Sequence, residues 1–180
     1  MLSLLARGWL AINPPMRQSS IPAARRLEYA QGFLSLGLVE EAAAELAALP
    51  ESERSSDAAL GLAVDVHVQR EAWEIAARCA EQLARRYPDE PDGWISWAYA
   101  VRRWKSIPDA EQVLLEAERH VGRTCALVHY NLGCYRCQLG DHAGALQRLA
   151  LAFRLDPAWK KAALVDPDLA PIKGELSAVV

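Results

Sequence analysis

The chain has 180 residues, and its 52% hydrophobic and 24% charged residues are typical of a globular protein. No apolar run reaches the ~20 residues that a membrane-spanning helix needs, so the sequence predicts no membrane span. The net charge is −3, and because residues 1–27 carry four arginines and no acid, the remainder carries −7, which argues against nucleic-acid binding.

Residues 1–22 differ in pattern from the later part of the chain. Apolar residues recur at helical spacing as far as Ile12, and Pro14 and Pro15 then end any helix. We interpret the segment as an N-terminal arm or a short helix packed on the rest of the chain. A transit peptide is the alternative, because the segment has arginine and serine but no acid, whereas Arg7 interrupts the apolar run of a secretory signal.

Residues 126–159 carry small and apolar residues where two short antiparallel helices would pack. Gly133 lies midway along the first expected helix, and Gly140 breaks the chain before the second. Ala145 begins an apolar stripe on the second helix, which ends before Pro157. We expect Gly133 to let the second helix approach closely, because glycine has no side chain.

The same pattern returns three times upstream, in steps of about 34 residues. One column of the pattern is always alanine, and we expect each of these to lie where the two helices of a pair cross, since a larger side chain would push them apart. The column consists of Ala42, Ala76, Ala110 and Ala145. The repeats span residues of about 23–56, 57–90, 91–125 and 126–159.

This pattern, with Leu132-Gly133, an alanine twelve positions later, a closing proline and a period near 34, resembles the tetratricopeptide repeat. The resemblance covers roughly three quarters of the chain. It implies an all-α fold: a right-handed α-solenoid of about four antiparallel helix pairs over residues 23–165. A C-terminal capping helix is expected at about 158–165, and residues 166–180 form a tail that packs on the last repeat through Leu169 and Ile172.

The individual copies depart from one another at the turn between their helices. Gly37 and Gly140 keep a turn glycine in the first and fourth copies, whereas Glu71 and Lys105 replace it in the second and third. We expect these replacements to keep the helix pairs and to affect the angles between successive repeats.

The resemblance implies a non-catalytic protein–protein interaction scaffold that binds a peptide or protein segment in its concave groove. In this family the first helix of each repeat lines the groove, and the resembling positions are Leu27, Gln31, Leu34, Val68, Ile95, Tyr99, Arg102, Arg103, Tyr130 and Gln138. One subgroup clamps a peptide C-terminus with lysine, asparagine and arginine; only Asn131 matches, so that ligand is not expected. The alternatives are a homo-oligomer whose groove is filled in trans, a groove filled by the chain's own tail, and a secretion-type chaperone.

Cys134 and Cys137 have the spacing of a redox pair or of half a zinc site. A thioredoxin-like pair begins a helix after a strand, whereas this pair lies inside an expected helix, and His129 and His142 do not complete a zinc ligand set. A thiol redox protein is therefore the least favoured alternative, and we expect no enzyme activity, no metal and no cofactor. Cysteines on helices and the lack of a secretory signal predict a cytoplasmic protein.

Overall fold

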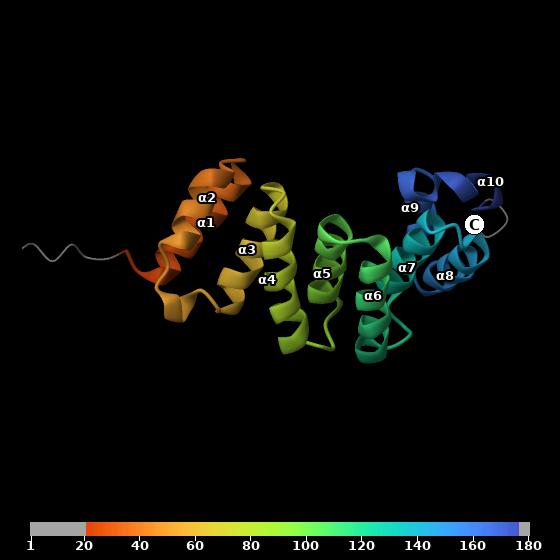
Figure 1. The fold of residues 1–180 in the computed structure, drawn as a ribbon, viewed down its shortest axis with the longest axis horizontal. Coiled ribbons are helices and arrows are strands. Elements are labelled where there is room, and N and C mark those ends of the chain that lie inside the picture. The colour runs from red at the N-terminus through yellow and green to blue at the C-terminus, as the bar shows by residue number, and fades with distance from the viewer. Residues whose placement is uncertain (1–20, 177–180) are drawn as a thin grey trace, which may run out of the picture.

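The computed structural model describes residues 21–176, and over them the protein is all-helical (Figure 1). The predicted arm, residues 1–22, lies outside the described part except for its last two residues, and so do the last four residues of the predicted tail. The helices are α1 (Ala23–Ser35), α2 (Val39–Ala47), α3 (Asp57–Gln69), α4 (Trp73–Arg86), α5 (Pro91–Trp104), α6 (Ile107–Val121), α7 (Ala126–Gln138), α8 (His142–Leu155), α9 (Ala158–Ala163) and α10 (Lys173–Leu176). Two 3-10 turns join them, η1 (Glu51–Glu53) and η2 (Pro167–Ile172).

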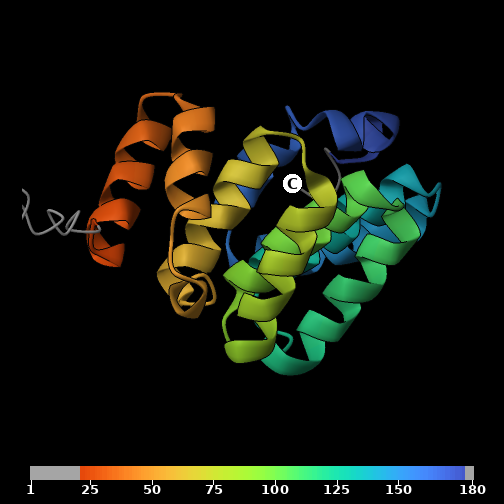
Figure 2. The same cartoon turned by 60° about the vertical axis from the view of Figure 1, so that its left-hand side comes forward.

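Successive helices pack as neighbours along the chain. α1 contacts α2, α3 contacts α4, α5 contacts α6 and α7 contacts α8, while α4–α5 and α6–α7 contacts join one pair to the next. Figure 1 shows the pairs following one another along the long axis of the molecule, and Figure 2 shows the α1–α2 pair at one end of this row. The helices and their contacts confirm the predicted all-α fold class with a repeat-like arrangement of helix pairs.

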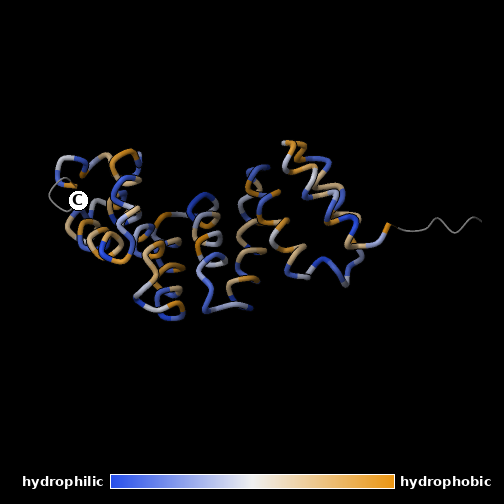
Figure 3. The backbone as a smooth tube through the Cα atoms, turned by 180° about the vertical axis from the view of Figure 1, so that it is seen from behind, coloured by the Kyte–Doolittle hydropathy of each residue, from blue (hydrophilic) through white to orange (hydrophobic). Residues whose placement is uncertain are grey.

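Polar and apolar residues are interleaved along the helices (Figure 3). α7 is the most enclosed of the longer helices, because Gln138 is its one exposed residue and the others are buried or half-buried. Between residues 21 and 176, no helix has both the length and the apolar content that crossing a bilayer demands.

Serine side chains cap the first turn of two of the helices. The Ser56 hydroxyl accepts a hydrogen bond from the Ala59 N–H at 3.3 Å, and the Ser106 hydroxyl accepts one from the Asp109 N–H at 3.2 Å. Each bond satisfies one of the backbone donors left free in the first turn of a helix.

Three of the four turns between paired helices place a residue at positive φ, and the third pair differs. Gly37 and Gly140 have φ of 74° and 82°, in the left-handed region where glycine has no steric penalty. Glu71 adopts φ of 55° at the corresponding place in the second pair, which is costly for a residue with a Cβ. Lys105 in the third pair has φ of −116° and makes a different turn.

The alanine column lies at the centre of the helix pairs. Ala42, Ala76, Ala110 and Ala145 are all 0% exposed, which confirms their predicted burial. A Cβ built on Gly133 would lie 2.8 Å from the Leu149 Cγ, so α7 and α8 approach as closely there as the sequence predicts.

The apolar core is divided in two near the start of the chain. A small cluster joins α1, α2 and α3 and consists of Ala30, Leu34, Ala42, Leu62 and Val66. A larger cluster runs from Ala76 in α4 to Leu176 in α10. The first helix pair is therefore not part of the continuous core that joins the other three.

The C-terminal segment turns back onto the fourth pair. Leu169 and Ile172 are both 0% exposed, and η2 contacts α7. Trp159 of α9 packs on Tyr130 with ring centroids 4.6 Å apart. α9 ends at Ala163, two residues before the predicted end of the capping helix, and Leu164 is 41% exposed in the turn after it.

Candidate peptide-binding surface

The ten residues predicted for the groove lie on α1, α3, α5 and α7, and the structure gives them different roles. Four apolar side chains are wholly or partly buried in packing between helices: Leu27, Leu34, Val68 and Ile95. Three contact the chain's own C-terminal segment: Arg102, Tyr130 and Gln138. Three are exposed with no hydrogen bond to that segment: Gln31, Tyr99 and Arg103.

Arg103 lies between two aromatic rings at the open part of this surface. Its guanidinium carbon is 5.5 Å from the Tyr99 ring centroid and 5.6 Å from that of Trp73, and the two rings meet edge to face at 6.0 Å. Both Tyr99 and Arg103 are exposed, and no carboxylate within residues 21–176 forms an ion pair with Arg103. We name Trp73, Tyr99 and Arg103 the aromatic–arginine cluster.

The sequence interpretation missed Trp73. It considered only the first helix of each pair, whereas Trp73 is the first residue of α4, the second helix of its pair. α4 packs against α5, and this contact brings the start of α4 beside the end of α5, where the two rings meet. A tryptophan directly after a turn was the available signal.

The chain's own C-terminal segment occupies the part of the surface formed by α5 and α7. Arg102 donates to both carboxylate oxygens of Asp168, and the second of these bonds, from Nη2 to Oδ1, measures 2.8 Å. The Tyr130 hydroxyl donates to Asp166 at 2.7 Å, and the Gln138 amide donates to the Asp168 carbonyl at 2.7 Å. Burial and the bond to Asp166 raise the pKa of Tyr130. Over α7, the chain's own tail is therefore the occupant of the predicted groove.

The closely spaced thiols lie beneath this segment. Cys134 and Cys137 are buried, and burial raises the pKa of both, with the nearby Asp166 carboxylate adding to the effect at Cys134. A nucleophilic cysteine needs the opposite shift, because the thiolate is its reactive form. All four cysteines of the chain are free.

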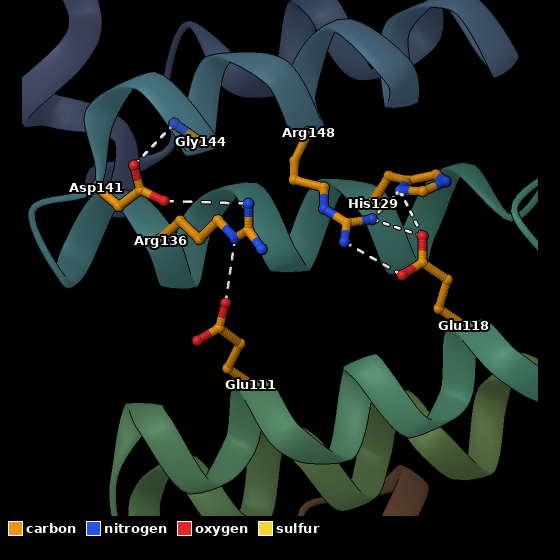
Figure 4. Close-up of polar contacts among 7 residues, drawn as sticks. All are labelled: Glu111, Glu118, His129, Arg136, Asp141, Gly144 and Arg148. Carbon is orange, nitrogen blue, oxygen red and sulfur yellow. Dashed lines mark hydrogen bonds and ion pairs between the residues drawn. The ribbon is translucent and has the colours of Figure 1, made fainter.

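A buried polar cluster joins α6, α7 and α8 behind this surface (Figure 4). Arg148 donates to the two Glu118 oxygens at 2.6 and 3.2 Å, and to the His129 Nδ1 at 3.0 Å. The other ring nitrogen of His129, Nε2, lies 2.9 Å from the Arg123 carbonyl, so a neutral ring donates there and accepts from Arg148. The hydrogen bond from Arg148 lowers the pKa of Glu118, and its charge adds to that effect.

A second ion pair of the same region lies beside the α7–α8 turn (Figure 4). Arg136 donates to Glu111 at 3.1 Å and lies 4.0 Å from Asp141, whose carboxylate in turn accepts from the Gly144 N–H at 2.9 Å. These contacts hold the third and fourth helix pairs together and begin α8. His129 has a structural role, because both of its ring nitrogens are within hydrogen-bond distance of neighbouring groups, the Arg123 carbonyl and the Arg148 side chain. No group of residues between 21 and 176 has the arrangement of a metal site.

The one position that matched a peptide-clamping subgroup has a local role. The Asn131 amide donates to the Leu127 carbonyl of its own helix at 2.9 Å.

In comparisons with known proteins, no protein-family model matches the chain and no curated protein matches it.

Proposed function

We propose that the chain is a non-catalytic protein-interaction scaffold, built as a right-handed tetratricopeptide-like solenoid, that binds an acidic segment of a protein partner at the aromatic–arginine cluster. The repeated helix pairs and the buried alanine column support the solenoid. The raised pKa values of Cys134 and Cys137 favour a scaffold over a thiol redox protein. Four free thiols are in keeping with a cytoplasmic site of action.

The observation that carries the proposal is the position of Arg103. An exposed arginine held between two rings loses little side-chain freedom on binding, and its outward N–H groups match a carboxylate. Tyrosine, tryptophan and arginine are also the residues that most often dominate the energy of protein interfaces. Within residues 21–176 the neighbouring Arg102 is paired with Asp168, so Arg103 is the arginine of the pair that remains available for a partner.

Selection of peptides from a random display library on the full chain tests the proposal without knowledge of the natural partner. We expect the selected peptides to be rich in aspartate and glutamate, and to bind the Arg103→Glu variant at least about tenfold more weakly, a loss of roughly 1.4 kcal/mol. Arg78→Glu is the matched control, because Arg78 is an exposed arginine on α4. Equal binding of the selected peptides to wild type and Arg103→Glu would rule out the cluster as the site.

Self-association is the competing function, and one feature favours it. Leu36 and Leu38, at the turn between α1 and α2, are 74% and 41% exposed, and adjacent exposed apolar residues are typical of contact surfaces. Light scattering over a dilution series separates the two functions. A mass that doubles with concentration, and that Leu36→Ser with Leu38→Ser returns to monomer, would favour a homo-oligomer.

A further inference from the structure

α1 lies at the end of the row of helix pairs, and among residues 21–176 no other helix pair precedes it (Figure 2). In each later pair, the first helix packs on the second helix of the pair before it, with α3 against α2, α5 against α4 and α7 against α6. α1 therefore has a side that corresponds to these contacts, but no described helix pair covers it.

The residues on that side follow from the later pairs. Ala63 of α3 lines a hollow together with residues of α2, and Trp97 of α5 lines another together with residues of α4. Tyr29 of α1 lies one period of 34 residues before Ala63 and two periods before Trp97. The counterparts of Phe33 and Leu36 line the same two hollows. We name these three residues the front face of α1: Tyr29, Phe33 and Leu36.

The front face is apolar and open to solvent. Tyr29 is 45% exposed and Leu36 is 74% exposed, and Phe33 between them is half-buried. Leu132, the counterpart of Tyr29 in α7, is 0% exposed. Large apolar side chains at spacings of four and three residues form the kind of stripe that a neighbouring helix covers.

The chain itself has a segment in the register of such a helix. One period before α2 (Val39–Ala47) lie residues 5–13. Gly8 falls in the alanine column, and Ile12 falls in a column whose later members are 0% exposed: Ala80, Leu114 and Leu149. Pro14 follows directly, and a helix usually ends at the residue before a proline. The period and the proline therefore indicate the same helix end.

The length and charge of the intervening chain also fit. Residues 48–56 join α2 to α3, and residues 14–22, which are equally many, precede α1. Residues 1–20 contain two arginines and no acid, whereas residues 23–47 contain four glutamates and two arginines. The two segments thus have opposite net charge, which favours their contact.

We propose that residues 5–13 form a helix that binds the front face of α1 in the same chain, in the place that the second helix of a preceding pair takes. In this register Trp9 faces Tyr29, because its counterparts Ala43 and Ala77 line the two hollows beside the next first helix. Contact between the two rings removes apolar area of both from water. The proposal does not depend on the aromatic–arginine cluster, which lies on α4 and α5.

Photocrosslinking of the full chain tests where residue 9 lies. Benzoylphenylalanine introduced in place of Trp9 should form a crosslink within one molecule, and mass spectrometry should map it to residues 25–36. The matched control has the same group in place of Leu10, whose counterparts are exposed in all four pairs: Ala44, Arg78, Gln112 and Gln147. The control should give several-fold less crosslink to α1.

Amide hydrogen exchange tests whether the contact covers α1. Ile12→Asp should accelerate exchange of residues 29–36 several-fold, because a carboxylate cannot be buried against an apolar stripe without a partner. Leu10→Asp is the matched control and should leave this exchange unchanged, because position 10 faces water in the proposed register. Unchanged exchange of α7 in both variants shows that the rest of the chain stays folded.

Three results would overturn the proposal. The first is a crosslink from position 9 that joins two molecules, because the front face would then bind a second copy of the chain. The second is a crosslink from position 9 that avoids α1, and the third is equal acceleration by Ile12→Asp and Leu10→Asp. None of these results bears on peptide binding at Arg103, so the two proposals can fail separately.

Discussion

Arg102 in α5 and Asp168 in η2, which lie 66 positions apart in the sequence, form a two-pronged ion pair that ties the C-terminal segment to the third helix pair. Both side chains are largely buried, at 22% and 25% exposed. A charged pair of this geometry is stronger than an exposed one, because less water competes for the two groups.

Asp168→Asn should therefore lower the free energy of unfolding by about 1 to 2 kcal/mol, since it keeps the shape of the side chain but removes its charge. Amide hydrogen exchange of residues 166–176 should accelerate more than that of α3 or α4, because the segment opens locally. Asp89→Asn, in the exposed turn after α4, is the control. Unchanged exchange in the segment would mean that its apolar anchors alone hold it.

The alanine column provides a sharp test of the repeat register. Ala110→Leu should cost about 1 to 3 kcal/mol, because the site is 0% exposed and has no space for a larger side chain. The loss should spread to the second and fourth pairs, since each pair is stabilised by its neighbours.

Ser35→Leu is the comparison for that variant. Ser35 is exposed at the end of α1, where its hydroxyl donates to the Gly32 carbonyl, so the change should cost well under about 1 kcal/mol. Urea unfolding measures both variants. Equal midpoints would show that the register is wrong, and with it the assignment of residues to the inner surface.

The features that the sequence predicts well are periodic or local. The alanine column recurs once per repeat, so its burial can be predicted without knowledge of distant residues. The close approach at Gly133 follows from the same periodicity. The periodic features predict the helices of the four pairs, whereas α10 lies in the segment that the sequence predicted only as a tail.

Local sequence patterns could not predict which part of the expected binding surface the chain itself covers. Its coverage over α7 depends on the pair of Arg102 with Asp168, which no local pattern connects.

Glu71 gives a prediction in the opposite direction, a substitution that stabilises. The residue has φ of 55° in the turn between α3 and α4, where Gly37 and Gly140 serve the first and fourth pairs. Glu71→Gly should raise the free energy of unfolding by about 1 kcal/mol, because it relieves the clash of a Cβ in this conformation.

Lys105→Gly is the matched control for this variant. Lys105 occupies the corresponding turn with φ of −116°, so glycine relieves nothing there and adds freedom to the unfolded chain. The midpoint temperature of thermal unfolding should therefore rise for Glu71→Gly and fall for Lys105→Gly. A shift of the same sign in both would show that the turn conformation is not the cause.

The Glu118–Arg148 pair predicts how stability changes with pH. Glu118 faces Arg148, His129 and Arg123, and the hydrogen bond from Arg148 holds its pKa below the ordinary value of 4.5. The folded protein therefore binds a proton at this carboxylate less readily than the unfolded chain does. It follows that the contribution of Glu118 to stability is fully present above pH 4.5 and is lost as the pH falls through the lowered pKa.

Glu118→Gln should consequently cost about 1.5 to 3 kcal/mol at pH 7, because it removes a charged hydrogen-bond acceptor from a largely buried arginine. The difference in the free energy of unfolding between wild type and variant should decrease below pH 4.5. The wild-type carboxylate becomes protonated there and loses the same interaction. Urea unfolding at pH 7, 5.5, 4.5 and 3.5 measures the gap. Glu41→Gln, exposed on α2, should change stability by less than about 0.5 kcal/mol throughout. A gap for Glu118→Gln that stays constant over the whole series would mean that the side chain stabilises the α6–α8 contact by its packing and not by its charge.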